Sequence, residues 1–498
     1  MGTKSPGMVA HYLRYSTANV MVILAGFVSF PVLTRLLDNT QYGILGYYET
    51  WALMAVAFGK LGTQHALQRY YPHDGDAGAT RSFATNYFHL PMVISVGLWL
   101  LVVAGLLVFD WASGSRQSPV MWLALASVPM AVYASLVDTV LRVRESSKLV
   151  MLSRIGSRWL QLVLMLSAVV WIQQSAFAVY GAKLAGTLLV VAFYLYWARR
   201  HLPFSRAAVD AGMARQGLSF GGPMIIYEAF AVALILVDRV MLKFLTGDFA
   251  VVGIFSIGAA LALQVHMFMN LAIFESFTPL ANRLNVTAGA SAVRALKSSV
   301  LMPMTYASVG VSVLLWCFGT DVILALSGPD KVASGPVFAV MGVTRALLPV
   351  LLVAGYGLIM GKRSTQVMVL MCGSLLVNSV LNWVWIPQFG VMGAVYATLV
   401  SSTALAVGHC VWVPRDLLKL PDARTVVTAG GVAAGCIVAV WATGLFGLRP
   451  GWERLLVGGT VVGLAYCSLV LLLDARIRMQ VLGLLRSRSR AGAIAAGS

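Results

Sequence analysis

The sequence predicts an all-α protein that crosses a membrane many times. About fourteen apolar segments, each about 20 residues or longer, fill most of the 498-residue chain, and this is the length a helix needs to span a bilayer. Hydrophobic residues make up 59% of the chain and charged residues only 11%, with a mean hydropathy of +0.83. The third observation is that successive loops are alternately rich and poor in basic residues. Little chain remains outside the bilayer, so the function must lie among the helices.

The predicted spans follow one another with short connections. We place them at 12–34, 43–66, 83–109, 119–141, 149–171, 176–198, 219–245, 250–275, 298–319, 333–360, 364–386, 390–413, 425–447 and 452–473.

The distribution of basic residues predicts the topology. By count, about 26 of the 36 Lys and Arg residues fall on one side of the membrane, six on the other and four within spans. Basic loops face the cytoplasm, so both termini are expected there. The first span lacks a small-residue cleavage site and is expected to remain as an anchor. The net charge of +18 is explained by these loops, and no nucleic-acid partner is expected.

The second half of the sequence weakly repeats the first at an offset of about 210 residues. The matches are 42–44 with 252–254, Pro91 with Pro303, and the Trp171 to Gly181 segment with the Trp385 to Gly393 segment. Six helices return the chain to its starting side, so the two lobes should be related by an axis along the membrane normal. We predict an N-terminal lobe at 1–198, a cytoplasmic linker at 199–218, a C-terminal lobe at 219–413, two additional helices within 414–474 and a basic tail at 475–498.

Several ionisable residues fall inside the predicted spans, where a charge costs about 2.5–3.5 kcal/mol. Five cations are candidates for binding an anion, such as a phosphate or pyrophosphate, in a wet cleft between the lobes: Arg35, Lys60, Lys183, Arg239 and Arg345. Four further groups are candidates for coupling to a proton or sodium gradient: Asp138, Asp238, His266 and Glu275. Each of these residues could instead form a buried ion pair that fixes helix packing.

Lys60 and Lys183 have the strongest claim to a wet cavity. No acidic residue stands three or four positions away from either lysine on its own helix. Helix hinges are predicted at Pro31, at 221–223 and at Pro349, where the helix can bend.

Motifs of soluble catalysis are missing from the sequence. There is no G-x-x-x-x-G-K-[ST] loop for ATP, no H-E-x-x-H pair and no cysteine spacing typical of a metal site. We therefore expect no catalytic residues, no metal and no cofactor, and transport is favoured over catalysis.

The chain resembles a known family, the polysaccharide transporter or O-antigen flippase branch of the multidrug/oligosaccharidyl-lipid/polysaccharide exporter superfamily. The matching positions are 33–37 with Tyr42 and Gly43; Asp238 and Arg239 with 253–256; and Asn378, Asn382, 386–390, Gly393, Ala394, Ala397 and Thr398. The resemblance implies a V-shaped helix bundle in the bacterial inner membrane. It also implies that the protein flips undecaprenyl-pyrophosphate-linked oligosaccharides to the periplasmic leaflet, for lipopolysaccharide or exopolysaccharide synthesis.

The resemblance further implies the partners: the isoprenoid-pyrophosphate-linked glycan, membrane lipids, and a polymerase and glycosyltransferases of the same pathway. Two alternatives remain open at the level of sequence. A multidrug or cation antiporter of the same superfamily would depend on acids such as Asp138, Glu228 or Glu275. A membrane glycosyltransferase or polymerase would need acidic residues in a large outer loop, and the sequence has no such loop.

Overall fold

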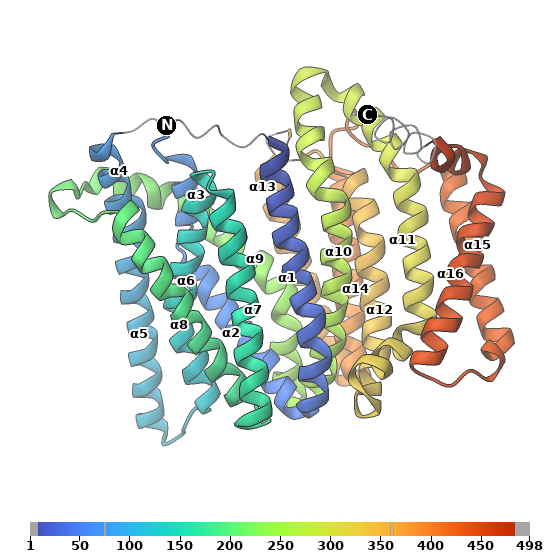
Figure 1. Cartoon of the computed structure of the whole chain (residues 1–498), viewed down its shortest axis with the longest axis horizontal. Coiled ribbons are helices and arrows are strands. Elements are labelled where there is room, and N and C mark those ends of the chain that lie inside the picture. Colours follow the sequence, from blue (N-terminus) through green and yellow to red (C-terminus); the bar gives the residue numbers. More distant parts are fainter. Residues whose placement is uncertain (1–7, 74–75, 359, 362, 484–498) are drawn as a thin grey trace, which may run out of the picture. The chain divides into compact units, whose positions relative to one another are not determined.

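The computed structural model describes residues 8–73, 76–358, 360–361 and 363–483, and all regular secondary structure in these ranges is helical (Figure 1). For residues 8–16, 223, 227, 271–276, 364 and 445–446 the description covers the backbone alone. The principal helices are α1 (Met8–Leu36), α2 (Asn39–Gly59), α3 (Thr63–Arg69), α4 (Ala77–Phe83), α5 (Leu90–Ser113), α6 (Pro119–Val143), α7 (Ser147–Trp171), α8 (Ala176–His201), α9 (Ala211–Thr246), α10 (Phe249–Thr287), α11 (Gly289–Ser327), α12 (Gly335–Ala354), α13 (Ser364–Phe389), α14 (Val391–Trp412), α15 (Ala423–Thr443) and α16 (Gly459–Leu473).

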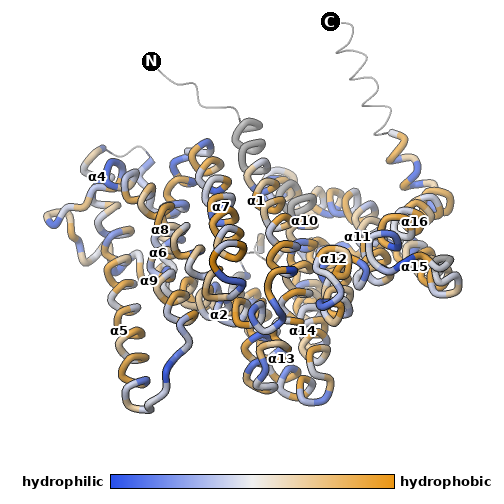
Figure 2. The backbone as a smooth tube through the Cα atoms, turned by 60° about the horizontal axis from the view of Figure 1, so that its bottom comes forward, coloured by the Kyte–Doolittle hydropathy of each residue, from blue (hydrophilic) through white to orange (hydrophobic). Residues whose placement is uncertain are grey.

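Twelve of the described helical segments are long and apolar enough to cross a membrane, and a thirteenth is gained if the bent helix α9 is counted. Figure 2 shows apolar residues along most of α5, one of these segments. The all-α, multi-pass fold is therefore confirmed. Every predicted span overlaps helical structure, although the span 43–66 is divided between α2 and α3. Helix α2 is not among the twelve because its Tyr, Thr and Gly residues lower its mean hydropathy.

Contacts group the chain into two compact units. The first unit comprises Met1–Ser256 and Ser379–Val391, and the second comprises Ile257–Asn378 and Met392–Ser498. The predicted boundaries at 1–198, 199–218, 219–413, 414–474 and 475–498 stay predictions.

The first unit is built around α6 and α8. Helix α6 packs against α2 and α8, and α7 packs against α1 and α8. Along α6, Val128, Val132, Leu136 and Val140 are buried at intervals of four residues, which places them on one helix face. Phe88 joins them in a continuous apolar core. Within a membrane such side chains hold helices together by close van der Waals packing, so this closely packed face fixes the position of α6.

Helices α2 and α10 cross at a backbone contact within the first unit. A Cβ atom at Gly43 would lie 1.8 Å from the carbonyl oxygen of Phe249, and one at Gly253 would lie 1.8 Å from that of Asn39. Glycine is therefore required at both positions, because any side chain would force the two helices apart.

The predicted span 43–66 is not one continuous helix, and this expectation is wrong. Helix α2 ends at Gly59 with Lys60 as its C-cap, Leu61 has φ +51° and Gly62 has φ +65°, after which α3 begins. Two successive residues in the left-handed region stop a right-handed helix. Lys60 consequently lies at a helix end rather than within a helix.

Helix α9 bends by 42° between Ala211–Gly222 and Met224–Thr246. The break falls at the predicted hinge 221–223. This segment contains two glycines and a proline, residue types at which helices commonly kink.

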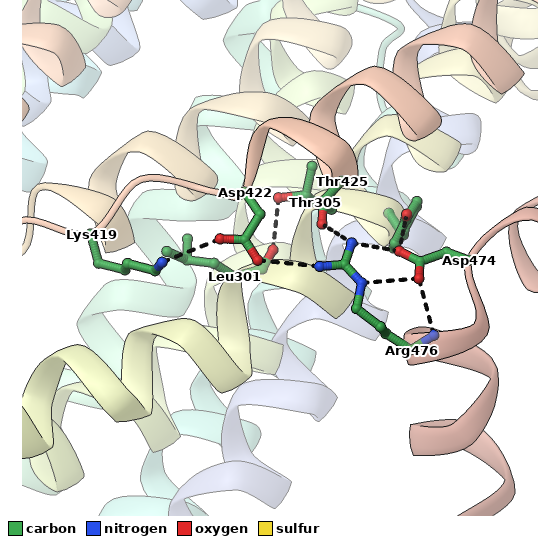
Figure 3. A network of polar contacts seen from close by, with 8 residues as sticks. Leu301, Thr305, Lys419, Asp422, Thr425, Asp474 and Arg476 are labelled. Carbon is green, nitrogen blue, oxygen red and sulfur yellow. Dashed lines mark hydrogen bonds and ion pairs between the residues drawn. The ribbon is translucent and has the colours of Figure 1, made fainter.

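The second unit is organised around α11, which packs against α12, α15 and α16. Tyr306, Val313, Val432 and Tyr466 belong to its apolar core. At one end of this core Asp474 is fully buried, and Arg476 donates hydrogen bonds to both of its oxygens, at 3.1 Å and 2.8 Å (Figure 3).

The Asp474 carboxylate also ties other helices together. The Tyr306 hydroxyl donates a hydrogen bond to Asp474 Oδ2 at 2.8 Å, and Arg476 contacts Asp422 at 3.4 Å and Thr425 Oγ1 at 3.3 Å. Figure 3 shows the contacts of Arg476 with Asp422 and Thr425, at the start of α15. Charge-assisted hydrogen bonds are stronger than neutral ones, so this network holds the start of α15 against the chain that follows α16.

Lys297 corrects the sequence interpretation at another point of the second unit. It stands directly before the predicted span 298–319 and was therefore expected in a basic loop, but it lies in α11 and is completely buried. Its ammonium group donates hydrogen bonds to the carbonyl oxygens of Ala354 at 2.9 Å, Tyr356 at 2.7 Å and Leu417 at 2.5 Å. Carbonyls after a helix end lack helical partners, and the buried cation satisfies three of them at once.

Candidate functional site

Lys60 lies opposite an acid from another helix. Its ammonium group donates to Glu228 Oε1 on α9, and the Gln64 side-chain amide on α3 donates to Glu228 Oε2. The side chains of Lys60 and Glu228 are only 14% and 20% exposed. Both oxygens of one carboxylate are therefore held by donors that flank the break between α2 and α3.

Lys183 has a comparable partner. Its ammonium group on α8 donates to Glu49 Oε2 on α2, and the Tyr180 hydroxyl donates to the same oxygen at 3.1 Å. Lys60 and Lys183 thus both form the ion pairs that the sequence left open as an alternative, and their role in substrate binding stays a prediction. Neither lysine has an acid three or four positions away on its own helix, but each meets one from a neighbouring helix, which a search along one helix cannot reveal.

Arg239 extends this cluster in the first unit. Its Nε donates to the Ser256 hydroxyl at 3.1 Å, and its positive charge acts on the carboxylates of Glu49 and Asp238. Asp238 is 1% exposed and accepts a hydrogen bond from the Asn382 amide at 2.7 Å. The two neighbours on α9 thus take part in separate polar contacts, as their different directions on the helix predict.

Asp138 on α6 is balanced by two arginines. Arg154 on α7 approaches its Oδ2 at 3.0 Å and Arg142 approaches it at 3.3 Å. This arrangement joins α6 to α7 and gives the group a net positive charge. The proposed role of Asp138 in ion coupling stays a prediction.

The remaining candidates are divided between the units. Arg35 lies in the last turn of α1, in the first unit. In the second unit, Arg345 on α12 acts electrostatically on His266 on α10, whose Nε2 lies 2.8 Å from the Asn270 amide. The side chain of Glu275 lies outside the described residues.

The structure therefore brings Glu49, Lys183 and Arg239 together, with Lys60 in a second cluster. Glu49 was missed by the sequence reasoning, although an acidic residue within a predicted span was itself a signal. Paired charges of this kind cost less to bury than single ones, and they still present donors that an anion can compete for. The substrate-binding role of the five cations stays a prediction.

The fold defines the class of protein to which this chain belongs. It is similar to "Lipid II flippase MurJ, inward closed conformation", with a TM-score of 0.69, 10% identity, and coverage of 94% of this chain and 99% of that chain. It is also similar to the inward-facing form of a multidrug resistance MATE family transporter of the MOP superfamily, with a TM-score of 0.58, 14% identity, and coverage of 81% and 97%. The class is thus a multi-pass α-helical membrane protein whose fold is similar to that of these two proteins.

Sequence comparison is more specific. The model of the family described as "Polysaccharide biosynthesis protein" matches residues 9–285, more than half of the chain, so the chain belongs to this family. A relative, "Lsg locus putative protein 1" of Haemophilus influenzae, is 22% identical over 396 residues, covering 74% of this chain and 91% of that protein.

Proposed function

We propose that this protein is a flippase for lipid-linked oligosaccharides. The observation that carries the proposal is the placement of Lys60, Lys183 and Arg239 among membrane helices, in a polysaccharide biosynthesis protein whose fold matches that of a lipid II flippase. The substrate is an oligosaccharide joined through pyrophosphate to an isoprenoid carrier, which moves from the cytoplasmic to the periplasmic leaflet of the bacterial inner membrane.

The chemistry of the substrate explains why such residues are useful. A sugar-phosphate headgroup cannot cross hydrocarbon unaided, because its polar groups would lose their hydrogen bonds to water. Lysine and arginine donors supply replacement hydrogen bonds and compensate the phosphate charge. Alternating access of the headgroup to the two sides of the membrane completes the transfer while the isoprenoid tail stays among lipids.

The basic loops support a cytoplasmic location of both termini. Glycosyltransferases of the same pathway would supply the lipid-linked oligosaccharide, and a polymerase would use it after it is flipped. A membrane gradient of H⁺ or Na⁺ is the proposed energy source, with Asp138, Asp238, His266 and Glu275 as candidate coupling groups.

Reconstitution tests the proposal. Purified protein in liposomes should move a fluorescent isoprenoid-pyrophosphate oligosaccharide across the bilayer, as measured by its accessibility to a membrane-impermeant quencher. Protein-free liposomes and liposomes with an unrelated multi-pass protein are the controls. Failure to move the lipid under an imposed H⁺ or Na⁺ gradient of either direction would contradict the proposal.

A multidrug or cation antiporter is the second candidate, supported by the TM-score of 0.58 with a MATE transporter and by the buried Asp238–Asn382 contact. The two candidates predict different phenotypes of a deletion strain. Loss of an antiporter sensitises cells to cationic drugs, whereas loss of the flippase removes a surface polysaccharide and leaves drug susceptibility unchanged.

A further inference from the structure

The Lys60–Glu228 contact lies beside an apolar cavity of about 430 Å³ in the first unit. Gly59 and Leu61, the neighbours of Lys60 in the chain, both line this cavity. Ile225, one helical turn before Glu228, lines it as well. A charged pair and an apolar cavity thus share the same stretch of α2 and α9.

The cavity itself is suited to a hydrocarbon chain. Residues from α5 and α6 complete its lining, among them Leu98, Trp99, Val102 and Leu125. The Trp99 indole N–H is already used, because it donates to the Leu125 carbonyl at 2.9 Å. The volume lies within the range of about 300–1,000 Å³ found for small-molecule sites.

The backbone between α2 and α3 holds the Lys60–Glu228 ion pair next to the apolar cavity. A Cβ atom at Gly62 would lie 2.1 Å from the Gly221 carbonyl oxygen, so the break touches α9 directly. Leu61 has φ +51°, a conformation that costs a non-glycine residue about 1 kcal/mol or more and that is found preferentially at functional sites. This contact holds Lys60 and Gln64 opposite Glu228.

The geometry at Glu228 resembles the recognition of an anion. Its two oxygens accept hydrogen bonds from an ammonium group and from an amide. Phosphate oxygens accept hydrogen bonds from the same kinds of donor. Both donors belong to the break, whereas the carboxylate belongs to α9. An incoming phosphate group could therefore replace the carboxylate without rearranging the donors.

We propose that Glu228 is a displaceable counterion. It holds Lys60 and Gln64 while no substrate is bound, and the pyrophosphate of the lipid-linked glycan takes its place while the adjoining isoprene units enter the cavity. This inference rests on the proposed function. Return of Glu228 to Lys60 then competes with the pyrophosphate and promotes release.

Binding of a short amphiphile to the detergent-solubilised full chain tests the counterion. The probe is a fifteen-carbon isoprenyl pyrophosphate. Inorganic pyrophosphate, which has only the anionic group, and the fifteen-carbon isoprenyl alcohol, which has only the hydrocarbon chain, are the comparators. Glu228→Gln should bind the probe about fivefold more tightly, the value of removing a competitor worth about 1 kcal/mol. It should also flip lipid more slowly, because release is impaired.

Two further variants define the effect. Lys60→Gln should weaken probe binding, since it removes the cation for which both anions compete. Asp321→Asn is the matched control, because it removes a carboxylate from the Arg454 ion pair in the second unit and should leave probe binding unchanged. Unchanged or weaker binding by folded Glu228→Gln would overturn the inference.

Photocrosslinking tests the cavity with the wild-type chain and so does not depend on the folding of a variant. An isoprenyl pyrophosphate with a diazirine on its first isoprene units should label peptides of α5 and α6 that contain Leu98, Val102 or Leu125. A second apolar cavity of about 420 Å³, lined by Gly310 and Gly463, is the built-in comparison. Labelling of that cavity instead, or equal labelling of α5 and α6 by a diazirine phospholipid, would overturn the assignment.

The two proposals can fail separately. If the wild-type protein moves no lipid-linked glycan, the proposed function fails. If it moves the glycan but Glu228→Gln binds the probe no more tightly, only the counterion inference fails.

Discussion

The Lys183 ammonium group on α8 donates a hydrogen bond to the Glu49 carboxylate on α2, 134 residues earlier in the chain. The Tyr180 hydroxyl contacts the same oxygen, and the side chains of the ion pair are 26% and 34% exposed. An ion pair in this position links two helices of the first unit and keeps a cation available within the membrane region. The coupling free energy between Glu49 and Lys183 can therefore be measured as a property of the candidate site.

Glu49→Gln should destabilise the protein, because it leaves Lys183 without its carboxylate. In a double-mutant cycle with Lys183→Gln, we expect a coupling free energy of about 1–2 kcal/mol. Thermal unfolding in detergent measures each variant. Additive effects of the two substitutions would show that the pair contributes nothing to stability.

Gly43→Ala should separate α2 from α10, since its Cβ atom would lie 1.8 Å from the Phe249 carbonyl oxygen. We expect a loss of about 1–3 kcal/mol, as for other overpacked contacts, measured by thermal unfolding. Gly97→Ala is the matched control, because nothing lies within 4 Å of its Cβ position. It should be neutral or slightly stabilising, since alanine favours a helix. Equal effects of the two variants would argue against the close crossing.

Lys297→Met should be among the more damaging single substitutions in the second unit. It leaves the carbonyls of Ala354, Tyr356 and Leu417 without the donor that now reaches all three. We expect a loss of about 2–4 kcal/mol in thermal unfolding, because buried unsatisfied polar groups are costly. Lys148→Met, at an exposed position, should change stability by less than about 0.5 kcal/mol. Similar stability of the two variants would contradict the assigned role of Lys297.

The Asp474 carboxylate should make stability depend on pH. Hydrogen bonds from Arg476, assisted by one from Tyr306, hold the pKa of Asp474 well below its usual range, although burial opposes them. A lowered folded-state pKa means that the ionised group stabilises the fold above its unfolded pKa of about 4. This stabilisation is lost as the pH falls below that value.

Asp474→Asn should therefore lower the free energy of unfolding by about 1–2 kcal/mol at pH 7, which reflects a charged network whose arginine is partly exposed. The difference from the wild type should shrink at pH 3.5. Asp416→Asn, at an exposed position, should behave like the wild type at both pH values. A deficit of Asp474→Asn that is independent of pH would show that packing, not charge, is responsible.

The sequence predicts the helical architecture well because hydropathy depends on each segment alone. It fails at α2, where Leu61 and Gly62 take positive φ and end the helix inside a predicted span. Leucine gives no warning of such a conformation, because the contact of Gly62 with Gly221 that enforces it comes from a distant part of the chain.

The candidate charges were found from sequence, but their partners were not. Glu228 and Glu49 approach Lys60 and Lys183 from other helices, and periodicity along one helix carries no information about such pairs. Lys297 was missed for the same reason. Near other basic residues it suggests a loop, whereas the carbonyls that it satisfies belong to segments more than 50 residues away.

Charge neutralisation within the translocation assay tests whether the intramembrane cations carry the anionic headgroup. The triple variant Lys60→Gln, Lys183→Gln and Arg345→Gln is compared with the wild type for movement of a fluorescent isoprenoid-pyrophosphate oligosaccharide, after both are shown to be folded and equally inserted in liposomes. The variant should lose at least about 90% of the rate, since each lost charge-assisted contact is worth about 1.5–3 kcal/mol. Wild-type rates in the folded triple variant would contradict the claim that these cations carry the anionic headgroup.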